Sequence, residues 1–220
     1  DKITPYTSGV NALDLIKHIH DHDRWSSFDQ HHEAALYCLR KMKEYGLETE
    51  VFELPADGET TYGDWVMPCA WVAKSAKLTL LPADKRDEVV LCNYREEPCS
   101  LVVYSKPTPP GGVTAEVVVV NGGSRAEDYE GLDVEGKIVF TSSSARHSRI
   151  EALKHGALGI ISDYLPVIDY YRPPMELPDC RFWDRFSTDG YGGWGMKKGD
   201  AECWGFVLTP RQGQWLRELV

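Results

Sequence analysis

Apolar residues recur at helical spacing in the first quarter of the chain. A first helix is predicted with one apolar face at positions i, i+3, i+4 and i+7, formed by Ala12, Leu15, Ile16 and Ile19. Ser27 and Gln30 have the spacing of a capping box and open a second predicted helix, which Gly46 ends. The buried stripe expected on this second helix consists of Ala35, Cys38, Leu39 and Met42. Residues 47–54 are then expected to form a strand.

From Cys69 onward the pattern changes to short apolar runs that alternate with turn residues. These runs are rich in β-branched residues, which indicates strands, and they cover residues 78–81, 89–91, 101–104, 117–120, 138–140, 158–161 and 203–208. One helix is expected at 145–155, with the serines at 142–144 supplying its N-cap. Thr209, Pro210 and Gln212 predict a capped helix at the end of the sequence.

The composition narrows the classes of protein that fit this pattern. A chain of 220 residues with 42% apolar and 26% charged residues suits one large or two small globular domains. The formal charge of −10 argues against nucleic-acid binding, and no apolar run is long enough to predict a membrane span. The six cysteines form no C-x-x-C pair and are expected to be reduced; with no N-x-S/T acceptor, this favours a cytoplasmic over a secreted protein.

Two motifs resemble known functional signatures but lack part of what those signatures require. His18 and His22 have the i, i+4 spacing of a helical zinc motif, yet Ile19 stands where that motif has its glutamate. The glycines at 190, 192 and 195 match G-x-G-x-x-G but do not lie between a strand and a helix. We therefore expect solvated histidines and a tight loop, and we assign no catalytic and no metal-binding residue.

The segment 164–198 is long, turn-rich and aromatic. A loop of this length is usually functional or disordered, and its many large rings argue against disorder. The rings either pack beneath their own loop or cover a binding cleft. Three of them are the candidates for a substrate lid: Trp183, Tyr191 and Trp194.

The stretch 115–164 resembles the protease-associated domain. The resemblance rests on a valine strand that ends in Asn121-Gly122-Gly123, on the run 128–139 (DYEGLDVEGKIV), and on the helix that leads to 156–161 (GALGII). Residues 43–47 (KEYGL) are similar to the start of a di-zinc aminopeptidase of metallopeptidase family twenty-eight. Residues 205–213 are similar to the segment that returns from the insertion of a protease-associated domain in that family.

This resemblance implies an α+β fold. A β-rich protease-associated domain, an open barrel or sandwich with flanking helices, would span 69–209, and the helix–helix–strand start of an incomplete peptidase domain would span 1–68. Residues 210–220 would begin a truncated return helix, so we expect the natural polypeptide to continue past Val220. The family's zinc ligands lie downstream of the insertion, and none can be matched in this chain.

The resemblance therefore implies a non-catalytic portion of a zinc-dependent aminopeptidase, inactive by itself, that covers the active site and helps to select substrate. Two zinc ions are expected in the full-length parent and none in this chain. The partners implied are the missing C-terminal peptidase domain and a peptide substrate. Two alternatives stay open. One is a self-standing module that binds peptide or carbohydrate through the loop 164–198, and the other is an intact hydrolase with an unrecognised site.

Overall fold

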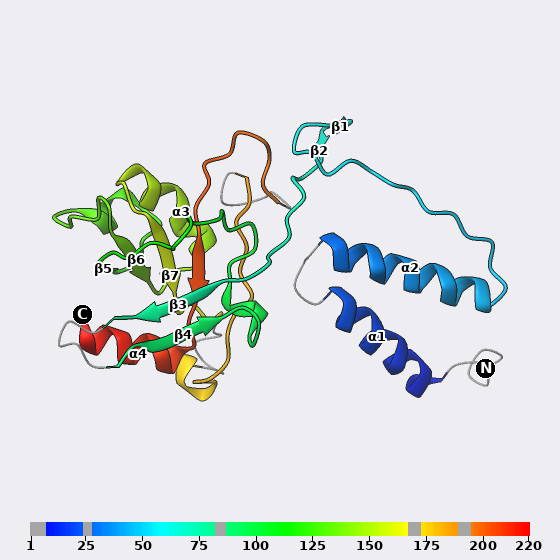
Figure 1. Ribbon diagram of the computed structural model, residues 1–220, viewed down its shortest axis with the longest axis horizontal. Helices are drawn as coiled ribbons and strands as arrows, with labels where there is room; N and C mark the ends of the chain where they lie inside the picture. Colours follow the sequence, from blue (N-terminus) through cyan, green and yellow to red (C-terminus); the bar gives the residue numbers. More distant parts are fainter. Residues whose placement is uncertain (1–7, 24–27, 82–86, 167–172, 189–194) are drawn as a thin grey trace. The chain divides into compact units, whose positions relative to one another are not determined.

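The computed structural model describes residues 8–23, 28–81, 87–166, 173–188 and 195–220. The chain divides into two compact units (Figure 1). Unit 1 comprises residues 1–55 and 70–73, and unit 2 comprises residues 56–69 and 74–220. Among the helices of the described ranges, none has the length and apolar character that crossing a membrane requires.

Unit 1 is built on two helices that lie side by side, α1 (Gly9–Asp23) and α2 (Phe28–Glu44) (Figure 1). Ala34 and Tyr37 are the buried residues of α2. The ring of His18 stacks on Tyr37 with 5.3 Å between centroids, and the ring of His22 lies 6.3 Å away. The predicted end of α2 is confirmed, because Gly46 adopts a φ of +77°.

The prediction of a buried stripe on α2 is wrong for Ala35 and Met42, which are exposed. The other two residues of that stripe, Cys38 and Leu39, are half-buried. The predicted face of α1 is also exposed apart from Leu15. A pair of helices buries only the narrow stripes that face each other, and in α2 that stripe runs through Ala34 and Tyr37. The apolar residues on the next face have no covering element in the described part of unit 1.

The strand predicted at 47–54 does not form. These residues make no strand pairing, and the large apolar side chains of Leu47, Val51, Phe52 and Leu54 are exposed. An extended segment becomes a strand only when a neighbouring strand takes up its hydrogen bonds. Within the described residues, no such neighbour lies beside 47–54.

Unit 2 centres on a four-stranded parallel sheet in the order β5-β6-β7-β8 (Figure 1). Its strands are β5 (Val117–Val120), β6 (Ile138–Thr141), β7 (Gly159–Ser162) and β8 (Gly205–Val207). Every residue of β6, β7 and β8 is buried. Burial on both faces is typical of parallel sheets and explains why these strands are continuous apolar runs in the sequence.

A helix lies on each face of this sheet. Helix α3 (Ala145–Lys154) joins β6 to β7 and packs on the face that carries Val139 and Ile160. Helix α4 (Pro210–Leu219) belongs to the opposite face, where the Arg217 guanidinium lies 4.2 Å from the centroid of the Phe140 ring. The capping box predicted for α4 is confirmed, with hydrogen bonds of 3.2 and 3.1 Å exchanged between Thr209 and Gln212.

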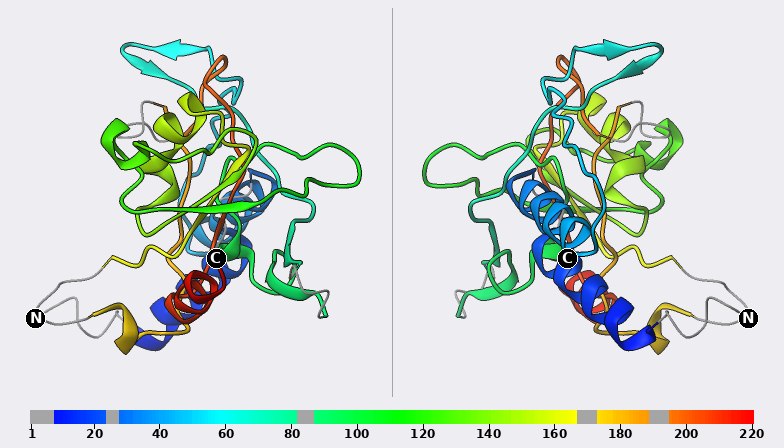
Figure 2. Two further views of the ribbon diagram at one scale, coloured as in Figure 1. Left: turned by 90° about the vertical axis from the view of Figure 1, so that its left-hand side faces the viewer. Right: turned by 90° about the vertical axis from the view of Figure 1, so that its right-hand side faces the viewer.

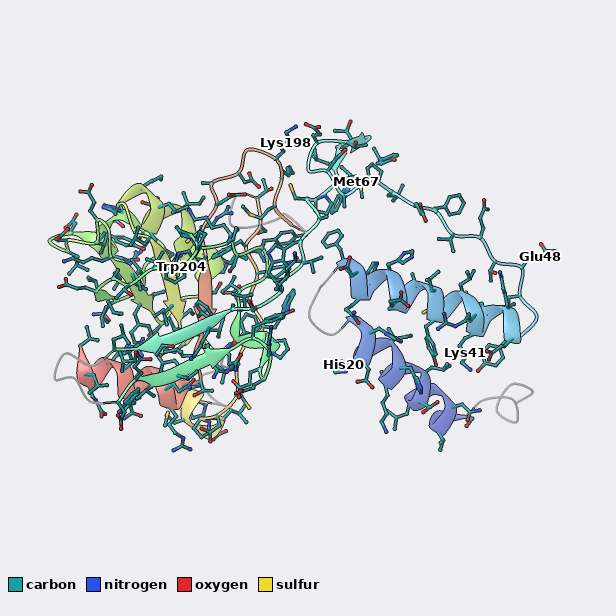
Figure 3. The ribbon with its side chains drawn as sticks, viewed as in Figure 1. His20, Lys41, Glu48, Met67, Lys198 and Trp204 are labelled. Atoms are coloured by element: carbon teal, nitrogen blue, oxygen red, sulfur yellow. The ribbon has the colours of Figure 1, made fainter. Side chains whose placement is uncertain are left out.

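The described residues of unit 2 also form two small antiparallel sheets. Strand β3 (Lys77–Leu80) pairs with β4 (Val89–Asn93), and β1 (Thr61–Tyr62) pairs with β2 (Trp65–Val66) in a hairpin that stands away from the parallel sheet (Figure 2). Beside this hairpin lies Lys198, whose N–H donates to the carbonyl of Gly58 at 3.1 Å (Figure 3). Its ammonium pairs with Glu59 at 2.8 Å, so residues 57–69 are held to the 195–198 segment.

The α+β class is confirmed, and most predicted strands are present. The described ranges also contain three short 3-10 helices: η2 (Pro98–Ser100), η3 (Ala126–Tyr129) and η4 (Pro174–Glu176). The run 101–104 is not a strand, because Leu101 and Val103 make only isolated bridges to Phe206 and Arg185. Tyr104 has a φ of +66°, which breaks the extended backbone at this point.

Unit 1 is expected to exchange its amide hydrogens faster than the parallel sheet. Its helices leave Val10, Leu13 and Ile16 more than half exposed, whereas Val139 and Phe140 are fully buried. Amides in α1 and α2 should therefore exchange roughly ten-fold or more faster than those in β6 and β7, as measured by hydrogen–deuterium exchange with mass spectrometry. Equal protection in both regions would mean that another element covers the helices.

Candidate functional site

The carboxyl ends of β5, β6 and β7 are the natural place to search for a site in unit 2. In open sheets of parallel strands, ligands bind beyond these ends, where loops and helix N-termini meet. In this chain, the loops there are rich in polar residues: Asn121 and Gly122 follow β5, Ser142 to Ser144 follow β6, and Asp163 follows β7. The question is whether these groups are available to a ligand or used by the protein itself.

The end of β6 leads into α3, whose N-terminus is capped by the buried carboxylate of Asp184. One oxygen of Asp184 accepts from the N–H of Arg146 at 3.3 Å and the other from the N–H of Arg185 at 2.8 Å. Ser144 occupies the N-cap position, but its side chain does not cap the helix, which corrects the sequence prediction. Burial raises the pKa of Asp184, although the hydrogen bonds that it accepts act in the opposite direction.

The loop after β5 is closed in the same way by Asp128. Its carboxylate accepts from the N–H groups of Ser124 and Arg125, each at 3.0 Å. Desolvation opposes the charge, but these hydrogen bonds outweigh it and lower the pKa of Asp128. Gly122 has a φ of +86°, and a Cβ added there would lie 2.8 Å from the carboxylate. The concave backbone thus holds an anion that the chain itself provides.

The third carboxylate, Asp163, follows β7 and binds Arg217 of α4. The guanidinium donates to both carboxylate oxygens, one of them at 2.9 Å, and also to the hydroxyl of Ser142 at 2.6 Å. A Cβ added at Gly213 would collide with Asp163, so α4 can lie at this distance only because residue 213 is glycine. All three strand ends are therefore occupied by carboxylates of the protein.

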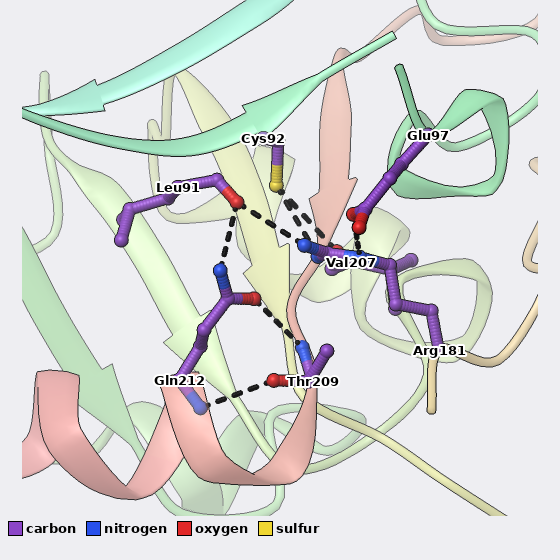
Figure 4. A network of polar contacts seen from close by, with 7 residues as sticks. All are labelled: Leu91, Cys92, Glu97, Arg181, Val207, Thr209 and Gln212. Atoms are coloured by element: carbon purple, nitrogen blue, oxygen red, sulfur yellow. Dashed lines mark hydrogen bonds and ion pairs between the residues drawn. The ribbon is translucent and has the colours of Figure 1, made fainter. Parts of the chain in front are cut away.

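A second polar network, centred on Arg181, joins the aromatic segment to the rest of unit 2 (Figure 4). The Arg181 side chain is buried, with Nε donating to Glu97 at 2.7 Å and Nη2 donating to the Leu91 carbonyl at 3.2 Å. Nη1 donates to the Val207 carbonyl and contacts the Cys92 sulfur. Burial raises the pKa of Cys92 to about 12, so this thiol stays protonated. Sequence reasoning missed Arg181, because nothing in the spacing of the chain marks it.

The described parts of the aromatic segment are anchored. Phe186 is fully buried, and the guanidinium of Arg185 lies 5.5 Å from the ring centroid of the half-buried Trp183. The N–H of Thr188 donates to the carbonyl of Gly195 at 3.1 Å, so the ends of the intervening loop meet. Of the three lid candidates the structure describes only Trp183, because Tyr191 and Trp194 lie outside the described residues.

The structure places two of the predicted histidines beside a tyrosine ring. His18 and His22 both lie against Tyr37, and the described ranges contain no group of three or more His, Cys, Asp or Glu side chains that could hold a metal ion. A structural or catalytic zinc needs at least three protein ligands. The described residues therefore do not fit a zinc site. The six cysteines, all of which are described, form no disulfide.

Asp184 is expected to stabilise the fold more at acidic than at neutral pH. Its pKa is raised by burial, so its contribution is complete below the pKa of the unfolded chain and falls as the pH rises through the folded-state pKa. Asp184→Ala should lower the free energy of unfolding by about 1–2 kcal/mol, because the helix loses its cap. Urea unfolding should show a larger loss of this free energy at pH 4 than at pH 7.

Asp179 provides a control with the opposite sign. Its hydrogen bonds to Arg211, at 2.8 and 3.0 Å, lower its pKa at the protein surface. The contribution of Asp179 is therefore present at neutral pH and lost as the pH falls. If the Asp179→Ala and Asp184→Ala variants lose stability with the same pH dependence, the assignment of a raised pKa to Asp184 is wrong.

Comparison with known proteins gives matches only to solved structures. No protein-family model and no curated protein matches the chain. The zinc aminopeptidase BSAP from Bacillus subtilis matches with a TM-score of 0.52 and 16% identity, over 92% of this chain and 41% of that chain. The aminopeptidase from Aneurinibacillus sp. strain AM-1 matches with a TM-score of 0.44 and 19% identity, over 98% of this chain and 42% of that chain.

At these identities the likeness concerns the fold alone. The chain spans about two fifths of the length of the solved chains that it matches. Nearly all of its residues take part in the match to the Bacillus subtilis enzyme. The fold of this chain is therefore similar to part of a zinc aminopeptidase.

Proposed function

We propose that this chain is the non-catalytic, protease-associated portion of a zinc-dependent aminopeptidase of metallopeptidase family twenty-eight. In this proposal it covers the active site of a peptidase body and helps to select the peptide substrate. The observation that carries the proposal is the unequal share of the two chains that the match covers. It covers 92% of this chain but only 41% of the Bacillus subtilis enzyme. The described residues contain no group able to hold zinc.

The polar edge of the parallel sheet supports a non-catalytic role. Asp128, Asp163 and Asp184 each bind groups of the chain itself at the ends of β5, β7 and β6. A catalytic carboxylate needs access to a substrate proton or to an attacking water. These three are committed to backbone N–H groups or to a guanidinium, so their arrangement favours a scaffold.

The division of the chain that we propose follows from the resemblance to an aminopeptidase with an inserted protease-associated domain. Residues 1–68 would belong to the peptidase body, 69–209 would form the protease-associated domain with its open barrel or sandwich, and 210–220 would begin the return helix. The exposed apolar side chains of unit 1 support the assignment of its two helices to the peptidase body, whereas residues 56–69 belong to the compact unit that contains the parallel sheet. Leu13, Ile16 and Met42 are about half exposed or more, and a peptidase body as partner would remove them from water.

The aromatic loop would be the substrate-side lid. The bond between Thr188 and Gly195 closes its stem, and Tyr104 packs at the same point, since a Cβ added at Gly195 would lie 2.5 Å from the Tyr104 hydroxyl. A lid needs a rigid base so that only its tip changes position. Trp183, Tyr191 and Trp194 would be the residues that face the substrate.

The proposal is tested by comparing this 220-residue chain with the longer polypeptide that the proposal implies. The chain alone should release no product from aminoacyl nitroanilides and should hold no stoichiometric zinc by elemental analysis, because a ligand set is missing from its described residues. The longer polypeptide should show both activity and zinc. A chain that hydrolyses peptides by itself, or one tightly held zinc lost in the His18→Ala variant, would contradict the proposal.

Within the active polypeptide, Trp194→Ala should change turnover or substrate preference while leaving the free energy of unfolding nearly unchanged. Trp204→Ala is the matched control, because Trp204 is buried against Gly159 in unit 2. The Trp204→Ala substitution should lower the free energy of unfolding by about 3–5 kcal/mol. The kinetic constants should be unchanged after they are corrected for the fraction of enzyme that is folded. Paired unfolding and kinetic measurements on both variants decide the matter. A defect of Trp194→Ala that is entirely one of stability would end the lid assignment.

A further inference from the structure

The tip of the β1–β2 hairpin, residues 62–65, carries two large rings on one face. Tyr62 and Trp65 stand opposite each other across the two strands, and Gly63 and Asp64 form the turn between them. Gly63 has a φ of +62°, which suits the first central position of a two-residue hairpin turn. Side chains opposite each other in an antiparallel pair lie on the same face. The two rings therefore flank the turn from one side.

Both rings at the hairpin tip are exposed. Tyr62 is 51% exposed and Trp65 is 46% exposed, and the hairpin stands away from the parallel sheet (Figure 2). In the described part of the chain, the side chains of Tyr62 and Asp64 make no hydrogen bond and no ion pair. Single exposed apolar residues are ordinary, but neighbouring ones mark an interaction site. Two large rings side by side at a protruding tip therefore indicate a binding surface.

The base of the hairpin is held firmly, unlike its tip. The backbone N–H groups of Glu59 and Thr60 donate to the Asp57 carboxylate at 3.0 and 2.8 Å. On the other strand, the N–H of Cys69 donates to the Met196 carbonyl at 2.8 Å. A base that is already ordered lowers the entropy that a ligand must pay when it binds at the tip.

The charge around the hairpin is negative. Residues 56–69 and 195–202, which backbone hydrogen bonds join, carry five carboxylates against two ammonium groups. Hydrogen bonds, above all that from the Thr60 hydroxyl, lower the pKa of Asp57 to about 2, so this carboxylate is ionised at neutral pH. Asp64 places a further carboxylate within the turn itself. A carboxylate and the face of an aromatic ring both attract cations.

We propose that the hairpin tip is a binding site for a cationic peptide segment, in which an arginine or lysine side chain lies over the rings of Tyr62 and Trp65 and pairs with Asp64. A guanidinium or ammonium group interacts favourably with the rings and the carboxylate together. An acidic side chain would be repelled by both, and a neutral one would leave the charge of Asp64 unused. This site goes beyond the proposed aminopeptidase role and belongs to the 220-residue chain by itself.

Titration of the isotope-labelled 220-residue chain with short peptides, followed by amide chemical shifts, tests this site. The probe is an acetylated and amidated tetrapeptide with two central arginines. Its control has citrulline at both positions, because citrulline keeps the shape of arginine without the charge. The shifts of Gly63, Asp64 and Trp65 should change most. The arginine peptide should bind roughly five-fold or more tightly than the citrulline peptide, and its affinity should fall as salt is added.

Two substitutions at the tip test the assignment of the contacts. Tyr62→Leu and Asp64→Asn should each weaken binding of the arginine peptide roughly three-fold. Both positions are exposed, so the thermal unfolding of the variants should match that of the unsubstituted chain. Tyr45→Leu is the matched control, because Tyr45 is a tyrosine of unit 1 that is 64% exposed. This third variant should bind the arginine peptide as the unsubstituted chain does.

Several results would overturn the proposal. Absence of any shift change, or equal affinity for the arginine and citrulline peptides, would mean that the tip does not bind a cation. Full affinity in both Tyr62→Leu and Asp64→Asn would place the contact elsewhere on the acidic surface. Saturable shift changes with a neutral oligosaccharide such as chitotriose, and none with the arginine peptide, would mean that the rings bind sugar instead.

Discussion

A parallel sheet forms only when both of its faces are removed from water, and the architecture of unit 2 follows from this constraint. Strands β6 and β7 are buried along their whole length. Glycine permits the close approach that this burial needs, because a Cβ added at Gly159 would collide with the Trp204 ring and one added at Gly213 would collide with Asp163. The covering elements can therefore lie directly on the sheet.

The same burial determines the polar chemistry at the carboxyl edge of the sheet. Strand ends and helix N-termini leave N–H groups that no neighbouring strand can take up. Asp128 and Asp184 accept these hydrogen bonds, while Asp163 neutralises Arg217. An edge that often binds ligands in other folds is thereby used for cohesion in this chain.

The local elements of unit 2 could be predicted from the sequence, and their pairing could not. Runs such as 117–120 and 158–161 have the length and composition of buried strands, and the capping box of Thr209 and Gln212 depends on neighbours in the chain. The cap of α3 comes from Asp184, which lies 38 residues away from Arg146, and no local pattern encodes such a contact. The exposure of Ala35 and Met42 escaped prediction for a related reason: periodicity identifies an apolar face but not the element that covers it.

The network around Arg181 has a consequence for how the chain folds as it is synthesised. The carbonyl of Leu91 receives its donors from Arg181 and Gln212, which lie 90 and 121 residues further along. The Cys92 thiol likewise donates to the Val207 carbonyl across 115 residues. A ribosome-bound chain can form the β3–β4 hairpin early but cannot lock it, because the locking groups have not yet been made. Contacts this distant slow folding, and the Leu91 carbonyl stays without its second side-chain donor until translation passes Gln212.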